Sequence, residues 1–255
     1  MSNAAKQGGL TTKKKKSGWW ETFKTIVYAV IAALIVRTVA YEPFNIPSGS
    51  MKSTLLVGDY IFVSKFSYGY THYSLPWSPN LFSGRIFGSA PERGDVAVFK
   101  LPADNETDYI KRIVGLPGDR IQVLDGALYL NGEAVPREQI EDFVETDASG
   151  MERRILQFIE TMPNGKRYTT LDSTPNGSLD NTSIFVVPEG HYFAMGDNRD
   201  HSQDSRTINV GYIPEENLIG RADSIFFSSN GTAHIWEFWK WGSAVRGSRI
   251  FKDIK

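Results

Sequence analysis

Two serines on either side of a glycine are the first residues in this chain that could support a reaction. Ser48 and Ser50 flank Gly49, directly after the apolar run Phe44–Ile46. A glycine beside a serine lets the backbone turn and expose a hydroxyl together with a nearby N–H. Acyl transfer needs these two groups, one as the nucleophile and the other to stabilise the oxyanion. The alternative interpretation is an ordinary loop rich in serine and glycine.

A lysine within an apolar strand pattern is the second candidate. In the alternating stretch 108–114, Lys111 falls on the same face as Tyr109 and Ile113, whereas Arg112 faces the other way. Burial disfavours the ammonium form and lowers the pKa of a lysine from its usual value of about 10.4. A neutral lysine can accept the proton of a serine hydroxyl, so the pattern favours a Ser–Lys pair. The alternative is a strand-edge lysine whose ammonium group stays in solvent.

A dense polar loop is the third candidate. Residues 196–206 contain three Asp, two Arg, two Ser, one Asn and one His, directly after a strand-like run. This composition predicts a loop braced by ion pairs, which could hold other groups in place. A calcium loop is disfavoured because the Glu that completes such loops is missing at the required spacing. A Ser–His–Asp site is a further alternative, since His201 follows Asp200 and precedes Asp204.

An apolar segment near the N-terminus predicts how the chain is anchored. Residues 23–41 comprise 19 residues, which as a helix extend about 28 Å, close to the thickness of a bilayer core. They follow Lys13–Lys16 and the pair Trp19-Trp20, so the tail 1–22 is expected to be cytoplasmic and the tryptophans to lie at headgroup level. The alternatives are a cleaved signal peptide ending at Ala40 and a buried helix.

The rest of the chain has the pattern of a mainly β protein. Short β-branched and aromatic runs alternate with turn residues, and Asn131-Gly132 predicts a tight hairpin. Residues 72–91 are expected to form a long loop, and residues 125–188 a smaller inserted lobe. One weak helix is expected over 138–143. The aromatic segment 235–241 suits either a membrane interface or the core.

Composition excludes several classes of protein. The chain has 255 residues, of which 41% are hydrophobic and 22% are charged, so it can bury a core without disulfides or structural metal ions. It has no Cys, which excludes disulfides, metal–thiolate sites and a cysteine nucleophile. Residues 1–24 have six lysines and one glutamate, and therefore a charge of +5, which leaves −6 on the body of a chain whose net charge is −1. An acidic body does not indicate a nucleic-acid partner.

Taken together, these segments resemble the bacterial type I signal peptidases, the leader peptidases with a Ser–Lys dyad. Five boxes between about residue 42 and residue 222 carry the resemblance, in the order in which they occur in that family. They are Phe44–Met51 with Thr54–Leu56, Gly58–Phe66, Arg93–Phe99, Asp108–Arg112 continuing through Gly115–Asp119, and Gly196–Asp200 with Asp204–Arg206. Ser53 and His201 depart from the residues that are common at their positions in the family, namely Pro and Asn.

The resemblance implies a role for each candidate residue. Ser50 would be the nucleophile and Lys111 the general base. The Ser48 hydroxyl and the Ser50 N–H would form the oxyanion hole, and Ser202 would orient the lysine amine. Two ion pairs would brace the site, and large apolar residues would line shallow pockets for the substrate. The pairs are Asp197 with Arg112 and Asp204 with Arg206, and the pocket residues are Phe44, Ile46, Met51, Leu55, Tyr109 and Ile110.

The function implied is that of a membrane-anchored serine endopeptidase that removes signal peptides from exported preproteins. It would cleave after small residues at positions −1 and −3, without a metal or other cofactor. Its partners would be preproteins and the lipid bilayer. The anchor would be a single span of the bacterial inner membrane, with the peptidase domain 42–255 on the extracytoplasmic side. The alternatives are a dedicated processing peptidase of a pilus or conjugation system and a non-catalytic, membrane-tethered β binding domain.

Overall fold

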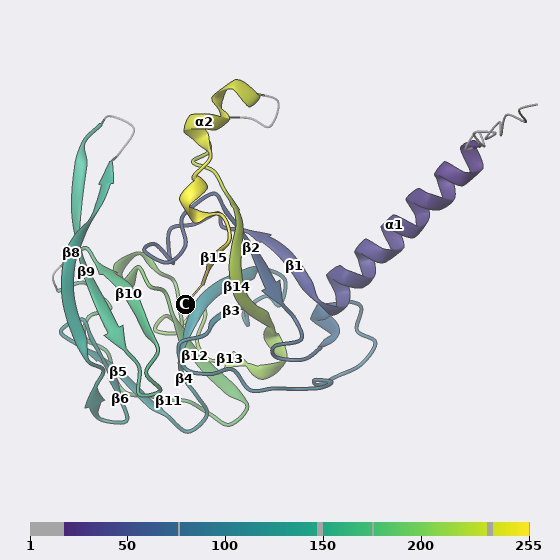
Figure 1. Ribbon diagram of the computed structural model, residues 1–255. Helices are drawn as coiled ribbons and strands as arrows, with labels where there is room; N and C mark the ends of the chain where they lie inside the picture. The colour runs from purple at the N-terminus through teal and green to yellow at the C-terminus, as the bar shows by residue number, and fades with distance from the viewer. Residues whose placement is uncertain (1–17, 76, 147–149, 175, 234–236, 255) are drawn as a thin grey trace, which may run out of the picture.

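The computed structural model describes residues 18–75, 77–146, 150–174, 176–233 and 237–254. Within them the chain forms one long N-terminal helix, α1, followed by a body built almost entirely of β-strands (Figure 1). The expected mainly β class is therefore confirmed. The lysine cluster Lys13–Lys16 and most of the basic tail lie outside the described residues.

Helix α1 (Trp19–Val39) has 21 residues, and none of them is buried against the body. It begins earlier and ends earlier than the expected 23–41, so Trp19 and Trp20 form part of its first turn. The helix ends before Tyr41 because the backbone of Tyr41 already pairs with Ser64 in the sheet. Figure 1 shows the helix projecting away from the body.

The main sheet joins segments from both ends of the chain. Its strand order is β1-β2-β14-β3-β4-β12-β13, with β15 paired to β14, and all its pairings are antiparallel. Its strands are β1 (Tyr41–Asn45), β2 (Asp59–Ser64), β3 (Val96–Lys100), β4 (Asp108–Gly115), β12 (His191–Met195), β13 (Ile213–Pro214), β14 (Leu218–Ser228) and β15 (Lys252–Asp253).

The sequence pattern explains which strands carry the core. Strand β2 alternates between buried and exposed residues, as expected for a strand with one face in solvent. Strand β3 is buried along nearly its whole length, in keeping with its position inside the sheet between β14 and β4. Ile61 of β2 and Val98 of β3 pack in one core cluster, and Phe99 of β3 packs in another.

The inserted lobe contains two further sheets. One has the order β10-β9-β8 and the other the order β11-β5-β6-β7. Their strands are β5 (Arg120–Leu124), β6 (Ala127–Leu130), β7 (Glu133–Ala134), β8 (Arg137–Thr146), β9 (Glu152–Thr161), β10 (Arg167–Asp172) and β11 (Phe185–Val186).

The lobe differs in two ways from the sequence expectation. It begins at Arg120 rather than near residue 125, because β5 pairs with β11. It also shares a hydrophobic core with the main sheet, in which Val114 and Met195 pack in one cluster with Ile121 and Leu128. The lobe is therefore fixed at the β4–β12 side of the sheet.

Two local expectations in the lobe have opposite outcomes. The hairpin at Asn131-Gly132 is confirmed, and both residues have the positive φ angles that its tight turn requires. The helix expected over 138–143 is wrong, because these residues belong to strand β8. Pairing with β9 along the length of the strand outweighs the weak local helix preference.

Short helices complete the described chain. They are η1 (His72–Ser74), η2 (Arg199–His201), η3 (Glu215–Asn217), η4 (Phe238–Lys240), α2 (Trp241–Ala244) and η5 (Gly247–Arg249). Apart from η1, the expected loop 72–91 has neither helix nor strand where it is described. Phe238, Trp239 and Trp241 are exposed, so the described aromatic residues of the 235–241 segment do not join the core.

Candidate active site

Ser50 and Lys111 meet although 61 residues separate them in the chain. Ser50 lies in the turn after β1, and Lys111 lies in the middle of β4. The Lys111 Nζ donates a hydrogen bond of 2.8 Å to the Ser50 Oγ and one of 2.9 Å to the backbone oxygen of Ile110. Both side chains are buried, with relative exposures of 8% for Ser50 and 4% for Lys111.

The surroundings of Lys111 favour its neutral form. Burial lowers the pKa of its amine to about 8, although the nearby carboxylates of Asp204 and Asp197 act in the opposite direction. The Nζ lies 5.1 Å from the centre of the Tyr109 ring. The amine is thus held away from solvent and in contact with a hydroxyl.

Strand β4 directs its two basic residues into different environments, as its alternation predicts. Arg112 is fully buried, and its Nε and Nη2 donate hydrogen bonds of 2.8 and 2.7 Å to the two carboxylate oxygens of Asp197. The Thr54 hydroxyl also binds Asp197, at 2.5 Å. The Arg112 guanidinium stacks over the Tyr168 ring of the lobe at 4.2 Å. This ion pair and its contacts therefore join four segments: the turn that contains Ser50 and Thr54 (the nucleophile turn), β4, the lobe and the polar loop.

A second buried ion pair lies within the polar loop. Arg206 donates hydrogen bonds of 2.9 and 2.8 Å to Asp204, and one to the backbone oxygen of Arg199. Burial alone would raise the pKa of Asp204, but Arg206 and the N–H of Gly196 hold it below its usual value. Asp204 is therefore ionised at neutral pH.

Gly196 permits the closest approach of this loop to the nucleophile turn. A Cβ at this position would lie 2.2 Å from the Ser202 Oγ and 2.6 Å from the backbone oxygen of Ser50. No real side chain can be accommodated at these distances. The glycine is therefore required by packing.

Ser48 and Ser202 occupy less direct positions. The Ser48 Oγ lies 3.5 Å from the Ser50 Oγ, on the exposed side of the turn. The Ser202 hydroxyl is buried and makes no hydrogen bond to any described residue, including Lys111. It lies close enough to Asp204 to contribute to the lowered pKa of that carboxyl. Its expected contact with the lysine amine is absent from this conformation.

A cavity of about 710 Å³ opens onto Ser50 and Lys111. Of the six expected pocket residues, Tyr109 and Ile110 line it. Phe44 lines a neighbouring cavity of about 220 Å³. The other three, Ile46, Met51 and Leu55, do not line the cavity and are buried in one core cluster. The turn after Ser50 directs Met51 and Leu55 inward, because the Leu55 N–H bonds to the Met51 oxygen and forms a helical turn.

Several cavity residues could not be identified from the sequence. Asn198 donates a hydrogen bond of 2.9 Å from its side chain to the Gly49 oxygen, and one of 3.0 Å from its N–H to the Ser50 oxygen. Asn198 lies within the polar loop 196–206, but its residue type and spacing did not distinguish it from the other polar residues of that loop. The lobe contributes Glu145, Arg153 and Ile155 to the cavity wall, and no local sequence signal indicated this.

His201 lines the cavity but does not contact Ser50 among the described residues. Its Nδ1 lies 3.2 Å from the Ser173 hydroxyl instead. The neighbouring Asp200 binds the N–H groups of Ser173 and Thr174. The sequence alternative of a Ser–His–Asp arrangement therefore has no support in the geometry.

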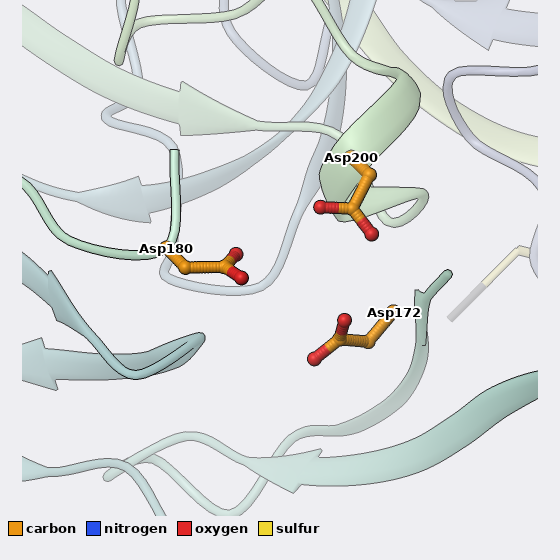
Figure 2. Close-up of side chains that lie close together, drawn as sticks. All are labelled: Asp172, Asp180 and Asp200. Atoms are coloured by element: carbon orange, nitrogen blue, oxygen red, sulfur yellow. The ribbon is translucent and has the colours of Figure 1, made fainter. Parts of the chain in front are cut away.

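Three carboxylates from separate segments meet beside this loop. Asp172, Asp180 and Asp200 point toward one another, and their closest oxygens all lie within 4.8 Å (Figure 2). Burial raises the pKa of Asp180, and the charges of Asp200 and Asp172 add to this effect. Arg137 binds Asp172 and offsets part of the negative charge. Among the described residues, these three are the group that could hold a cation.

Sequence comparisons with known proteins point to one family. A family model described as "Signal peptidase, peptidase S26" matches residues 19–227. A protein named signal peptidase I from Rickettsia typhi is 42% identical, over 92% of this chain and 93% of its own length. The corresponding protein of Rickettsia akari is 41% identical, over 96% and 95%. A solved signal peptidase I from Enterococcus faecalis is 27% identical with a TM-score of 0.31, and the match covers 52% of this chain and 97% of that structure.

Proposed function

The chain belongs to the signal peptidase I family of serine peptidases, and on that premise we propose that it cleaves signal peptides from exported preproteins with Ser50 as nucleophile and Lys111 as general base. The observation that carries this proposal is the 2.8 Å contact between the Lys111 Nζ and the Ser50 Oγ. A lysine whose pKa is lowered to about 8 can serve as a base near neutral pH.

The chemistry follows from this contact. Neutral Lys111 takes the proton of the Ser50 hydroxyl while the Oγ attacks the scissile carbonyl carbon. The tetrahedral intermediate collapses, and the Lys111 ammonium returns the proton to the leaving amine. The signal peptide is then held as an ester on Ser50. Lys111 next deprotonates a water molecule, which attacks that ester. The Lys111 ammonium then returns this proton to the departing Ser50 Oγ, and the signal peptide leaves with a free carboxyl group.

The oxyanion of each tetrahedral intermediate needs hydrogen-bond donors. The Ser50 N–H makes no hydrogen bond to any described residue, so it is available for this role. The Ser48 hydroxyl, 3.5 Å from the Ser50 Oγ, is the second donor that we assign to the oxyanion hole. Donors already in place in a site that excludes water stabilise developing charge with little reorganisation.

Rigid packing beneath the nucleophile supports a preference for small substrate side chains. Ile46, Met51 and Leu55 do not line the cavity but pack in one core cluster behind the turn that carries Ser50, so the turn cannot shift toward the core to enlarge the cavity. A packed core cannot relax to admit a bulky group at low cost. We therefore assign to the enzyme a preference for small residues, typically Ala, at positions −1 and −3 of the substrate.

Helix α1 supports an anchored enzyme with its body outside the cytoplasm. Members of this family are membrane-anchored, and α1 is long and apolar enough to cross a bilayer, with no residue buried in the body. We propose a basic cytoplasmic tail over residues 1–22, an anchor within 23–41 and an extracytoplasmic peptidase domain over 42–255. The lysines before the span favour this orientation.

Cleavage of a preprotein by the purified full-length protein in detergent tests the proposal. The substrate is a preprotein with Ala at positions −1 and −3, and the variants are Ser50→Ala and Ser53→Ala. Ser53 is the matched control, because it lies three residues further along the same turn and its hydroxyl bonds to the Thr169 oxygen, away from the cavity. We expect Ser50→Ala to abolish cleavage and Ser53→Ala to retain it. Cleavage by Ser50→Ala at the wild-type rate would remove Ser50 from the mechanism.

A further inference from the structure

The hairpin of β8 and β9 brings the inserted lobe to the edge of the catalytic cavity. Glu145 of β8 and Arg153 of β9 are register partners across the hairpin, and both line the cavity that contains Ser50 and Lys111. The ammonium group of Lys52, two residues after the nucleophile, forms an ion pair with Glu145. This pair ties the hairpin to the nucleophile turn, so the lobe forms one wall of the cavity.

Arg153 is the cation of this wall whose side chain has no partner among the described residues. Glu145 pairs with Lys52, and Asp108, which also lines the cavity, pairs with Lys100. The Arg153 side chain makes no ion pair or hydrogen bond with any described residue, and it is exposed. A positive charge is thus available to whatever part of the substrate passes along the hairpin.

The topology indicates which part of a preprotein that is. Helix α1 leads into β1 at one edge of the main sheet, whereas the lobe shares its core with β4 and β12 toward the other edge (Figure 1). In the anchored arrangement proposed above, a signal segment in the bilayer beside α1 would reach Ser50 from the β1 side. The chain that follows the scissile bond would then leave toward the lobe.

We propose that Glu145, Arg153 and Ile155 form the subsite for the first residues of the mature protein, and that Arg153 favours an acidic over a basic side chain there. This inference rests on the proposed function, because it concerns the part of the same preprotein substrate that follows the scissile bond. A partly exposed charge pair changes a binding preference modestly, so we expect the kcat/KM for a Glu-containing substrate to exceed that for the matching Lys substrate about threefold.

Paired peptides with the same Ala-x-Ala signal end test the proposal. Each pair has Glu or Lys at one of positions +1 to +4, and the readout is the Glu/Lys ratio of kcat/KM at each position. The enzymes are the full-length wild type, Arg153→Gln, Arg153→Glu and Arg154→Gln. Arg154 is the matched control, because it is the next arginine on the same strand, is also exposed and does not line the cavity.

We expect the wild type to prefer Glu at one or more of these positions. Arg153→Gln should bring the ratio there close to one, Arg153→Glu should invert it, and Arg154→Gln should leave it unchanged. An unchanged ratio in Arg153→Glu, or an equal change in Arg154→Gln, would overturn the inference. Failure of the wild type to cleave any of the peptides would instead contradict the proposed function.

Discussion

The pH dependence of cleavage is the sharpest consequence of the buried lysine. A lysine with the ordinary pKa of 10.5 is neutral in only about 0.03% of molecules at pH 7. With the pKa lowered to about 8 by burial, about 9% of the lysines are neutral at that pH. The structure thus increases the reactive form of Lys111 about 300-fold, which corresponds to about 3 kcal/mol.

The assay is kcat/KM for a peptide substrate between pH 6 and pH 10. The rate should rise about tenfold per pH unit up to about 8 and then level off, because only the free base accepts the proton of Ser50. The control is His201→Asn, which removes the one imidazole that lines the cavity among the described residues. Its profile should keep the same midpoint.

Two results would refute this reasoning. A midpoint near the usual histidine value of about 6.5 that disappears in His201→Asn would assign the base to histidine instead. A rate that rises only above pH 10 would mean that burial does not lower the pKa of Lys111. Either result would leave the contact between Lys111 and Ser50 without a catalytic role.

Two further predictions concern stability. Because burial lowers its pKa, Lys111 binds a proton less readily in the folded than in the unfolded chain. The substitution Lys111→Met should therefore raise the free energy of unfolding at pH 7 by up to about 3 kcal/mol, and it should abolish cleavage. Denaturant titrations should show the gain shrinking as the pH rises from about 8 to 10.5, and an equal gain at every pH would contradict the linkage. Asp197→Asn leaves Arg112 buried without its counter-charge, and should cost about 3–5 kcal/mol. A melting temperature equal to that of the wild type would show that this ion pair does not hold the loop.

The sequence was informative wherever the physical signal is local. Apolar character over a bilayer-spanning length predicted α1, and Asn131-Gly132 predicted a hairpin because few residues accept its φ angles. Strand alternation placed Lys111 and Arg112 on opposite faces before any partner was known. These outcomes depend on neighbours within one element, whose geometry is fixed by the backbone.

Local patterns failed where pairing between distant strands decides the outcome. Residues 138–143 form part of β8 because β9 pairs with them on both sides of a bulge between Ile140 and Phe143, and a short run cannot encode its partner's position. The family resemblance also assigned Met51 and Leu55 to the substrate pocket, but a single helical turn directs them into the core. The direction of that turn depends on the core of the main sheet, where Met51 and Leu55 pack against residues of β2, β3 and β14.

The identity of the candidate active-site residues could be predicted from the sequence, but the contacts between them could not. The candidate hydroxyl and base could be named from residue types and strand alternation, and the bracing ion pairs from the resemblance to the family. The 2.8 Å contact between Ser50 and Lys111, the approach of Gly196 to the nucleophile turn and the wall around Arg153 all depend on the packing of three sheets. Each joins segments that are far apart in the chain, and their spacing is set by strand register and by a shared core.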